Sequence, residues 1–165
     1  MKNLEIYIHI PFCVRKCEYC DFLSFPADDD AKLRYVKGLM AEMIFYGPLM
    51  KNYQVSSVYI GGGTPSSIDE QWIAALMEGV FDCFNVLPDA EISIECNPGT
   101  LSREKLLAYK DAGINRLSIG LQSANNDELK RLGRIHTFEQ FATNYELARN
   151  VGFKNINVDL MYGLP

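Results

Sequence analysis

The segment "IHIPFCVRKCEYCDF" (residues 8–22) places three cysteines within eight positions, directly behind an apolar, alternating run. Cys13, Cys17 and Cys20 follow the spacing C-x3-C-x2-C. The alternation predicts a β-strand over residues 4–10, so the three thiols are expected on the loop that follows this strand. Three soft ligands on one short loop indicate a metal centre.

The number of thiols limits the kind of centre. Iron–sulfur clusters and structural zinc sites both usually take four protein ligands. Zinc would need His9, Cys83 or Cys96 to complete its set, and three unreactive core thiols are a further alternative. A 4Fe-4S cluster held by three cysteines instead leaves one iron open for a substrate or cofactor. We favour the cluster, and we expect Cys83 and Cys96, which lie outside the spacing, to be core thiols.

Composition excludes several other classes of protein. The chain has 165 residues, 48% hydrophobic and 22% charged, which is enough for one globular domain with a real core. A net charge of −5 provides no basic field for nucleic acid and no polybasic membrane anchor. No secretion signal or integral membrane segment is recognisable. Five cysteines, an odd number, suit a reducing compartment, so we expect a cytoplasmic protein.

Strand and helix patterns alternate along the chain. Short β-rich runs occupy residues 4–10, 55–63, 90–97, 115–123 and 155–163. Helical patterns occupy roughly 29–47, 68–84, 102–112, 126–132 and 138–151, with Ser67-x-x-Glu70 and Thr137-x-x-Gln140 as expected capping boxes. This order predicts an α/β fold with a parallel sheet, either open and doubly wound or curled into a barrel.

Polar and glycine residues gather where the predicted strands end. The cysteines follow the first strand and "GGGTP" follows the second, while Glu95, Gln122 and Asp159 lie at or near the ends of the next three. Both parallel architectures place their chemistry at the carboxyl ends of the strands. These groups are therefore expected to converge on one mouth of the sheet.

The order of these motifs resembles that of the radical S-adenosylmethionine superfamily. Within it, "YIHIPFC", "GGGTPS", "SIECNPGT", "SIGLQS" and "VDLMYGLP" are similar to the HemN/HemW branch, which covers oxygen-independent coproporphyrinogen III oxidases and haem chaperones. The resemblance implies a partial (βα)6 TIM-like barrel, with five strands in this chain. It also implies a 4Fe-4S cluster whose open iron is chelated by the methionine moiety of S-adenosylmethionine.

Carried over position by position, the resemblance assigns the cluster to Cys13, Cys17 and Cys20. Its implied cofactor contacts are Tyr7, Tyr19, Gly62, Gly63, Thr64, Glu95, Gln122, Arg134 and Asp159. From the residues alone, "GGG" followed by Thr-Pro also fits an ordinary strand-to-helix turn. Glu95 and Asp159 also fit salt bridges at strand ends, and Arg134 fits a solvated charge. Because an unpaired carboxylate in an apolar strand is costly, we prefer a functional interpretation of both acids.

The two histidines have less distinctive surroundings. His9 lies two residues after Tyr7 and therefore on the same side of the strand. It is expected either to face the site or to be a satisfied core residue. His136 precedes a helical pattern and is expected at the surface.

The branch that this chain resembles contains both an enzyme and a transfer protein. The resemblance implies that an external electron donor reduces the cluster and that a 5′-deoxyadenosyl radical is formed. The oxidase subgroup typically carries a fourth cysteine in C-x3-C-x2-C-x-C, where this chain has Phe22, and a longer segment before the first strand. Both differences favour the haem chaperones, which would pass haem to an acceptor protein. Decarboxylation of coproporphyrinogen III is the alternative, so enzymatic activity is left open.

The last residues, "DLMYGLP", stop at the point where a strand would be followed by the next helix. We therefore expect residues 1–165 to be the N-terminal part of a radical S-adenosylmethionine core domain. The haem-associated His-Asn motif of the branch would lie beyond Pro165, so no haem ligand is nominated here.

Overall fold

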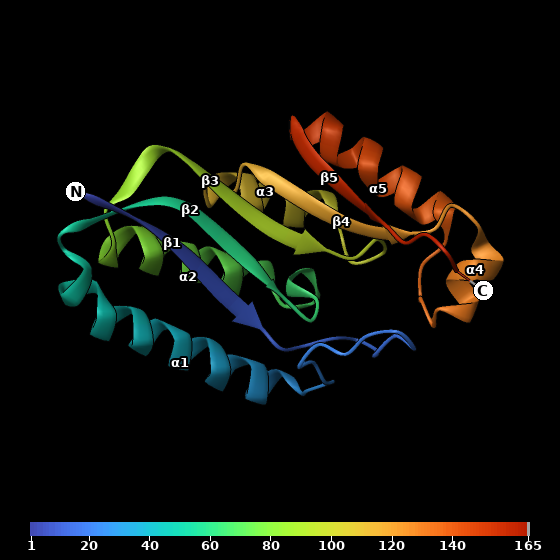
Figure 1. Ribbon diagram of the computed structural model, residues 1–165, viewed down its shortest axis with the longest axis horizontal. Helices are drawn as coiled ribbons and strands as arrows, with labels where there is room; N and C mark the ends of the chain where they lie inside the picture. Colours follow the sequence, from blue (N-terminus) through green and yellow to red (C-terminus); the bar gives the residue numbers. More distant parts are fainter. Residues whose placement is uncertain (165) are drawn as a thin grey trace.

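The computed structural model describes residues 1–164 as one sheet with helices packed against it (Figure 1). The strands are β1 (Lys2–Ile10), β2 (Tyr53–Gly62), β3 (Val86–Cys96), β4 (Arg116–Gln122) and β5 (Asn155–Leu160). The α-helices are α1 (Asp29–Tyr46), α2 (Glu70–Cys83), α3 (Arg103–Asp111), α4 (Asn126–Arg131) and α5 (Phe138–Val151). Short 3-10 helices, η1 (Gly47–Met50) and η2 (Pro65–Ser67), follow α1 and β2. All five predicted strands and all five predicted helices are present.

The strand order decides between the two predicted architectures. The five strands are parallel and lie in the order β1-β2-β3-β4-β5, so each strand pairs with the next one along the chain. A doubly wound sheet would reverse its order at one point. Because right-handed crossovers that always step in the same direction leave their helices on one side, the sheet is barrel-like. Figure 1 shows it fanning from β1 to β5.

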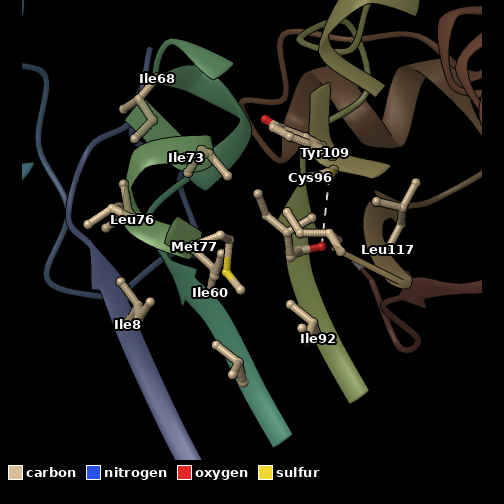
Figure 2. Packing of buried hydrophobic residues seen from close by; sticks show 14 of the residues in the cluster. Ile8, Ile60, Ile68, Ile73, Leu76, Met77, Ile92, Cys96, Tyr109 and Leu117 are labelled. Atoms are coloured by element: carbon tan, nitrogen blue, oxygen red, sulfur yellow. Dashed lines mark hydrogen bonds between the residues drawn. The ribbon is translucent and has the colours of Figure 1, made fainter. Parts of the chain in front are cut away.

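One face of the sheet is apolar and packs against the helices. Strand residues such as Ile8, Ile60 and Ile94 are at most 3% exposed and belong to one core cluster with Leu76 and Met77 of α2 (Figure 2). Each of these strand residues pairs with the next across the sheet, so they form a continuous row. Removing this apolar surface from water is the main contribution to the stability of the fold.

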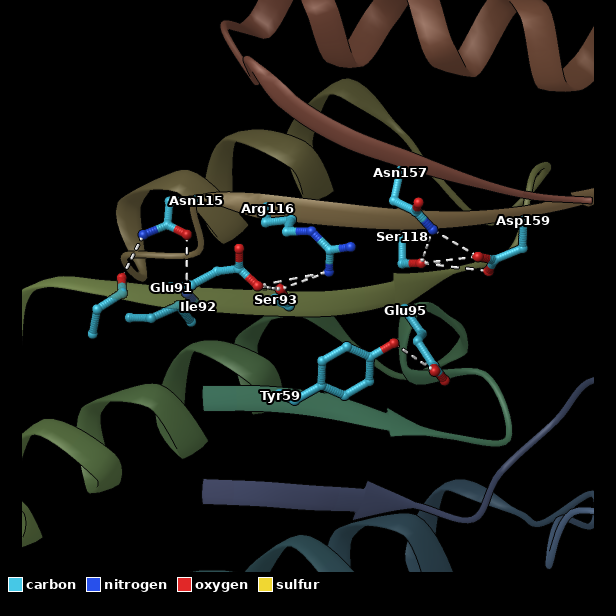
Figure 3. A network of polar contacts seen from close by, with 11 residues as sticks. Tyr59, Glu91, Ile92, Ser93, Glu95, Asn115, Arg116, Ser118, Asn157 and Asp159 are labelled. Carbon is cyan, nitrogen blue, oxygen red and sulfur yellow. Dashed lines mark hydrogen bonds and ion pairs between the residues drawn. The ribbon is translucent and has the colours of Figure 1, made fainter. Parts of the chain in front are cut away.

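The opposite face of the same sheet is polar. Its rows follow from the strand register: Tyr7 pairs with Tyr59 and then Ser93, and Glu95 pairs with Ser118 and then Asn157. Figure 3 shows several side chains of this face, among them Tyr59 hydrogen-bonded to Glu95 and Ser118 hydrogen-bonded to Asn157. Successive residues of a strand point to opposite faces, so the alternation in the sequence produces this division directly.

The helix starts confirm one predicted capping box and correct the other. Thr137 accepts a hydrogen bond from the Gln140 backbone N–H, and the Gln140 side chain accepts one from the Thr137 N–H, as predicted. At α2, however, the N-cap is Asp69, whose carboxylate accepts from the Gln71 N–H. Ser67 instead ends η2, because Pro65 starts a short 3-10 turn that delays the helix.

Candidate cluster and cofactor site

A pocket of about 380 Å³ opens at the carboxyl ends of the strands. Residues from the cysteine loop, the glycine loop, β3, β4, β5 and the segment before α5 line it together. The lining includes eleven of the twelve predicted positions: Cys13, Cys17, Tyr19, Cys20, Gly62, Gly63, Thr64, Glu95, Gln122, Arg134 and Asp159. The structure therefore brings these residues to one place, and their individual roles in binding remain predictions.

The glycine loop lies against the cysteine loop because it has no side chains there. The backbone N–H groups of Gly63 and Thr64 donate to the Ile10 and Phe12 carbonyls, each at 2.8 Å. A Cβ on Gly63 would lie 2.7 Å from the Phe12 oxygen and 2.9 Å from Cys13 Sγ. These distances are too short for any side chain, so close backbone approach explains glycine at position 63.

Arg134 joins the cysteine loop to the sheet. Its Nη1 donates to Cys17 Sγ at 3.7 Å and to the Tyr19 hydroxyl at 3.3 Å. Its Nη2 donates to Asn97 Oδ1 at 2.9 Å and to the Gly120 carbonyl at 2.7 Å. The Nε atom is buried without a hydrogen-bond partner among the described residues. Arg134 is thus anchored inside the pocket, beside a sulfur that would carry negative charge as an iron ligand.

Glu95 is held at the pocket wall by two donors. The Tyr59 hydroxyl donates to its Oε1 at 2.8 Å, and the Gly62 N–H donates to its Oε2 at 3.0 Å. Burial, followed by the carboxylate of Glu95, raises the pKa of Tyr59 far above its usual value, so this hydroxyl stays a donor. Neither donor is a cation, so the salt bridge considered for Glu95 does not form. Each carboxylate oxygen keeps a lone pair for a ligand.

Asp159 has neutral partners as well. Its carboxylate accepts from the Ser118 hydroxyl at 3.4 Å and from the Asn157 amide at 2.7 Å (Figure 3). Ser118 and Asn97 line the pocket but were not predicted from the sequence. Ser118 stands two residues before Gly120, so the two-residue period of the strand could have shown that it shares the polar face.

Tyr7 and His9 stand beside the pocket without lining it. Tyr7 is 58% exposed, its hydroxyl lies 3.0 Å from His9 Nδ1, and its ring stacks on Tyr59 with centroids 6.2 Å apart. His9 Nε2 contacts the Leu23 carbonyl at 3.2 Å. Tyr59 is hydrogen-bonded to Glu95, so Tyr7 is linked to the pocket wall through the Tyr59 ring. The contact of Tyr7 with the cofactor stays a prediction. His9 faces the polar side rather than the core.

The remaining cysteines and His136 are buried to different extents. All five thiols are free, Cys96 is buried, and Cys83 is partly buried against the core. Cys96 also borders the pocket. The prediction for His136 was wrong, because this side chain is only 4% exposed. Its ring is turned inward by a hydrogen bond between Nε2 and the Leu121 carbonyl, at 3.2 Å.

The three thiols of the cysteine loop are the expected ligands of the metal centre. Among the described residues, no group of three or more His, Cys, Asp or Glu side chains could hold a metal ion as placed. A structural zinc site needs all its ligands at about 2.0–2.3 Å from one point. Cys13, Cys17 and Cys20 nevertheless line the same pocket. Their role as the iron ligands of a cluster stays a prediction from the sequence.

The fold and the pocket together define a class of protein. The sequence matches the radical SAM superfamily over residues 7–165, and the chain belongs to this superfamily. Membership implies a 4Fe-4S cluster and S-adenosylmethionine as cofactors.

Particular relatives are similar over nearly the whole chain. The haem chaperone HemW of Escherichia coli K12 is 41% identical over 98% of this chain and 43% of its own length. HemW of Bacillus subtilis is 41% identical over 96% and 42%. The solved structure of the E. coli coproporphyrinogen III oxidase HemN superposes with a TM-score of 0.90 at 33% identity, over 99% of this chain and 38% of that one. This chain thus spans about two fifths of the length of these relatives.

The helices are also informative about membranes. Within residues 1–164, no helix combines the length and the apolar character that crossing a bilayer requires.

Proposed function

We propose that this chain holds a 4Fe-4S cluster through Cys13, Cys17 and Cys20 and binds S-adenosylmethionine beside it, as part of a haem chaperone. The observation that carries the proposal is the single pocket lined by the three thiols, the glycine loop and the polar ends of the strands. When bound, cluster and cofactor together supply one-electron cleavage of a sulfonium bond. The protein contributes binding, orientation and exclusion of water.

The residues of the pocket suit the polar groups of S-adenosylmethionine. Glu95 and Asp159 present carboxylate oxygens that are held by neutral donors. They complement the amino, hydroxyl or sulfonium groups of the cofactor. Arg134 is an anchored cation that complements a carboxylate or a thiolate. The glycine loop lets backbone groups approach the ligand without a Cβ in between.

The proposal of a chaperone rests on two features. The relatives described as haem chaperones are 41% identical to this chain over nearly all of it. In addition, Phe22, which is 66% exposed and lines the pocket, stands where the oxidase subgroup typically carries a further cysteine. We propose that the protein passes haem to an acceptor protein, draws electrons from an external donor, and works in the cytoplasm, where its free thiols stay reduced.

The cluster is tested by anaerobic reconstitution followed by iron and sulfide analysis. We expect four irons and four sulfides per chain, as a 4Fe-4S cluster requires, and loss of both in Cys13→Ala, Cys17→Ala and Cys20→Ala. Cys83→Ala and Cys96→Ala are the matched controls and should keep the cluster. Stoichiometric zinc without iron or sulfide in protein prepared without oxygen would overturn the assignment.

The transfer function is tested in the longest natural polypeptide that contains residues 1–165. With cluster, reductant and S-adenosylmethionine present, it is offered coproporphyrinogen III and, separately, haem. Haem binding without decarboxylation supports the chaperone. Robust conversion of coproporphyrinogen III would replace the chaperone by the oxidase alternative.

A further inference from the structure

Gln122, the last residue of β4, has an unusual backbone conformation. Its φ angle is +71°, and it is the one non-glycine residue with positive φ in the part of the chain that the structure describes. The left-handed region is unfavourable for a residue that has a Cβ. Such a conformation persists only where the surroundings hold it. The side chain of Gln122 lines the cofactor pocket, so its direction bears on binding.

Hydrogen bonds to three consecutive carbonyls hold this strand end. Arg134 Nη2 donates to the Gly120 carbonyl at 2.7 Å, His136 Nε2 to the Leu121 carbonyl at 3.2 Å, and the Met161 N–H to the Gln122 carbonyl at 2.9 Å. The pairing of β4 with β5 shifts register between Gly120 and Gln122. Because the ladder is interrupted there, the side chains before α5 replace part of it.

The strand end also determines where the Gln122 side chain goes. A Cβ on Gly120 would lie 2.9 Å from Gln122 Nε2 and 3.4 Å from Arg134 Nη2. The amide of Gln122 therefore folds back over Gly120, beside the guanidinium. A change of φ at position 122 would swing this amide away from the pocket wall.

His136 is suited to hold the strand end and has no other evident use. Its ring is buried, and only a ring nitrogen that carries a proton can donate to the Leu121 carbonyl, which places the proton on Nε2. Burial, and then the positive charge of Arg134, lowers the pKa of His136 to about 4, so the ring is neutral. Its Nδ1 is buried and has no partner among the described residues. The ring thus donates one hydrogen bond, and Leu121 receives it.

We propose that His136 is a positioning residue that holds Gln122 in its left-handed conformation and so fixes the Gln122 amide in the cofactor pocket. The inference rests on the proposed function, since it assumes that the pocket binds S-adenosylmethionine. His136 does not line that pocket. It acts through the backbone of β4, and this indirect action distinguishes it from Arg134, which contributes to the pocket directly.

The main test is a double-mutant cycle on the anaerobically reconstituted chain, read out as the dissociation constant for S-adenosylmethionine. We expect His136→Leu to weaken binding about tenfold, comparable to one lost hydrogen bond to a charged group, with the iron content unchanged. Gln122→Ala should weaken it similarly, and the double variant should be no weaker than Gln122→Ala alone. Additive losses, or unchanged affinity in His136→Leu, would overturn the proposal.

Two further variants separate positioning from a general loss of structure. In His136→Gln the side-chain amide can donate to the same carbonyl, so affinity should return to within about twofold of the wild type. Asn115→Ala is the matched control, because Asn115 bonds the backbone of Ile92 and Ala90 at the opposite end of β4. This variant should lower the unfolding midpoint and leave affinity unchanged.

A measurement without cofactor keeps the inference testable if the proposed function fails. Glycine relieves left-handed strain, so Gln122→Gly should raise the unfolding midpoint of the wild type. If His136 holds the conformation, the same substitution should give no gain in the His136→Leu background. An equal gain in both backgrounds would overturn the positioning role. Absence of S-adenosylmethionine binding in the wild type would overturn only the proposed function.

Discussion

At the scale of single residues, the site depends on where side chains are absent as much as on where they are present. Gly63 allows the second loop to contact the first, and Glu95 is held by a tyrosine and a backbone N–H of that loop. The sequence could predict both residues, because they lie in motifs at strand ends. It could not predict Tyr59 as the partner of Glu95, since the two are brought together only by the register of β2 and β3.

The contact between the two loops makes Gly63 important for the cluster itself. In Gly63→Ala the new methyl group would press on the Phe12 carbonyl and on Cys13 Sγ, so the first thiol should be displaced and cluster content should fall by at least half. Gly38→Ala on α1, where a Cβ meets nothing within 4 Å, is the matched control and should keep the full cluster. Equal iron content in both variants would contradict the close packing described here.

Glu95 should affect the cofactor and leave the cluster intact. The Glu95→Ala variant loses a carboxylate that lies in the pocket but contributes no thiolate. We expect the dissociation constant of S-adenosylmethionine to rise at least tenfold, since hydrogen bonds to charged groups contribute about 1.5–3 kcal/mol. Iron and sulfide should be unchanged. If calorimetry shows equal affinity in the variant, the cofactor does not use this wall of the pocket.

His136 should make stability depend on pH. Its pKa is about 4 in the folded chain and about 6.5 when unfolded, so between these values the unfolded state binds more protons. The free energy of unfolding should therefore fall as pH drops from about 6.5 towards 4, by up to roughly 3 kcal/mol, and level off below. His136→Gln cannot titrate, and urea unfolding from pH 7.5 to 4.5 should show a flatter profile. Parallel profiles would exclude His136 as the source.

At the scale of elements, the order of strands and helices could be predicted because short runs of alternating apolar and polar residues differ from the helical patterns between them. The predicted ranges agree with the observed ones within a few residues, and α5 agrees at both ends. The start of α2 was harder to predict from the sequence. Pro65 inserts a 3-10 turn, and the sequence offers Ser67 and Asp69 as competing caps two residues apart. Only the local backbone path selects Asp69.

The correction at α2 can be tested directly. Asp69 caps the helix through its carboxylate, so Asp69→Ala should lower the free energy of unfolding by about 1 kcal/mol. Ser67→Ala removes only a long contact of 3.5 Å to the Phe12 carbonyl and should cost less than half as much. Chemical denaturation of both variants measures the difference. A larger loss in Ser67→Ala would restore the capping box at Ser67-x-x-Glu70.

At the scale of the whole molecule, one sheet serves two purposes through its two faces. The apolar face packs against α1, α2, α3 and α5 and forms the core, whereas the polar face carries the hydroxyl, amide and carboxylate groups near the pocket. Both faces could be predicted from the sequence, because apolar and polar residues alternate in β1 to β4. It could not establish the hydrogen-bond partners across the polar face, which depend on strand register and curvature.

This division predicts that stability and binding respond to substitutions on opposite faces. Leu76→Ala empties a fully buried position in the core and should cost about 2–5 kcal/mol of unfolding free energy. Asp159→Asn keeps the side-chain volume on the polar face, where the described partners of this side chain are Ser118 and Asn157, and should change stability by less than about 0.5 kcal/mol. It should nevertheless weaken the binding of S-adenosylmethionine, because a carboxylate at the pocket is replaced by a neutral amide. Unfolding curves and cofactor titrations of both variants measure the two effects. If Asp159→Asn were as destabilising as Leu76→Ala, the polar face would be part of the folding core, and the carboxylates at its strand ends would be structural rather than kept for a ligand.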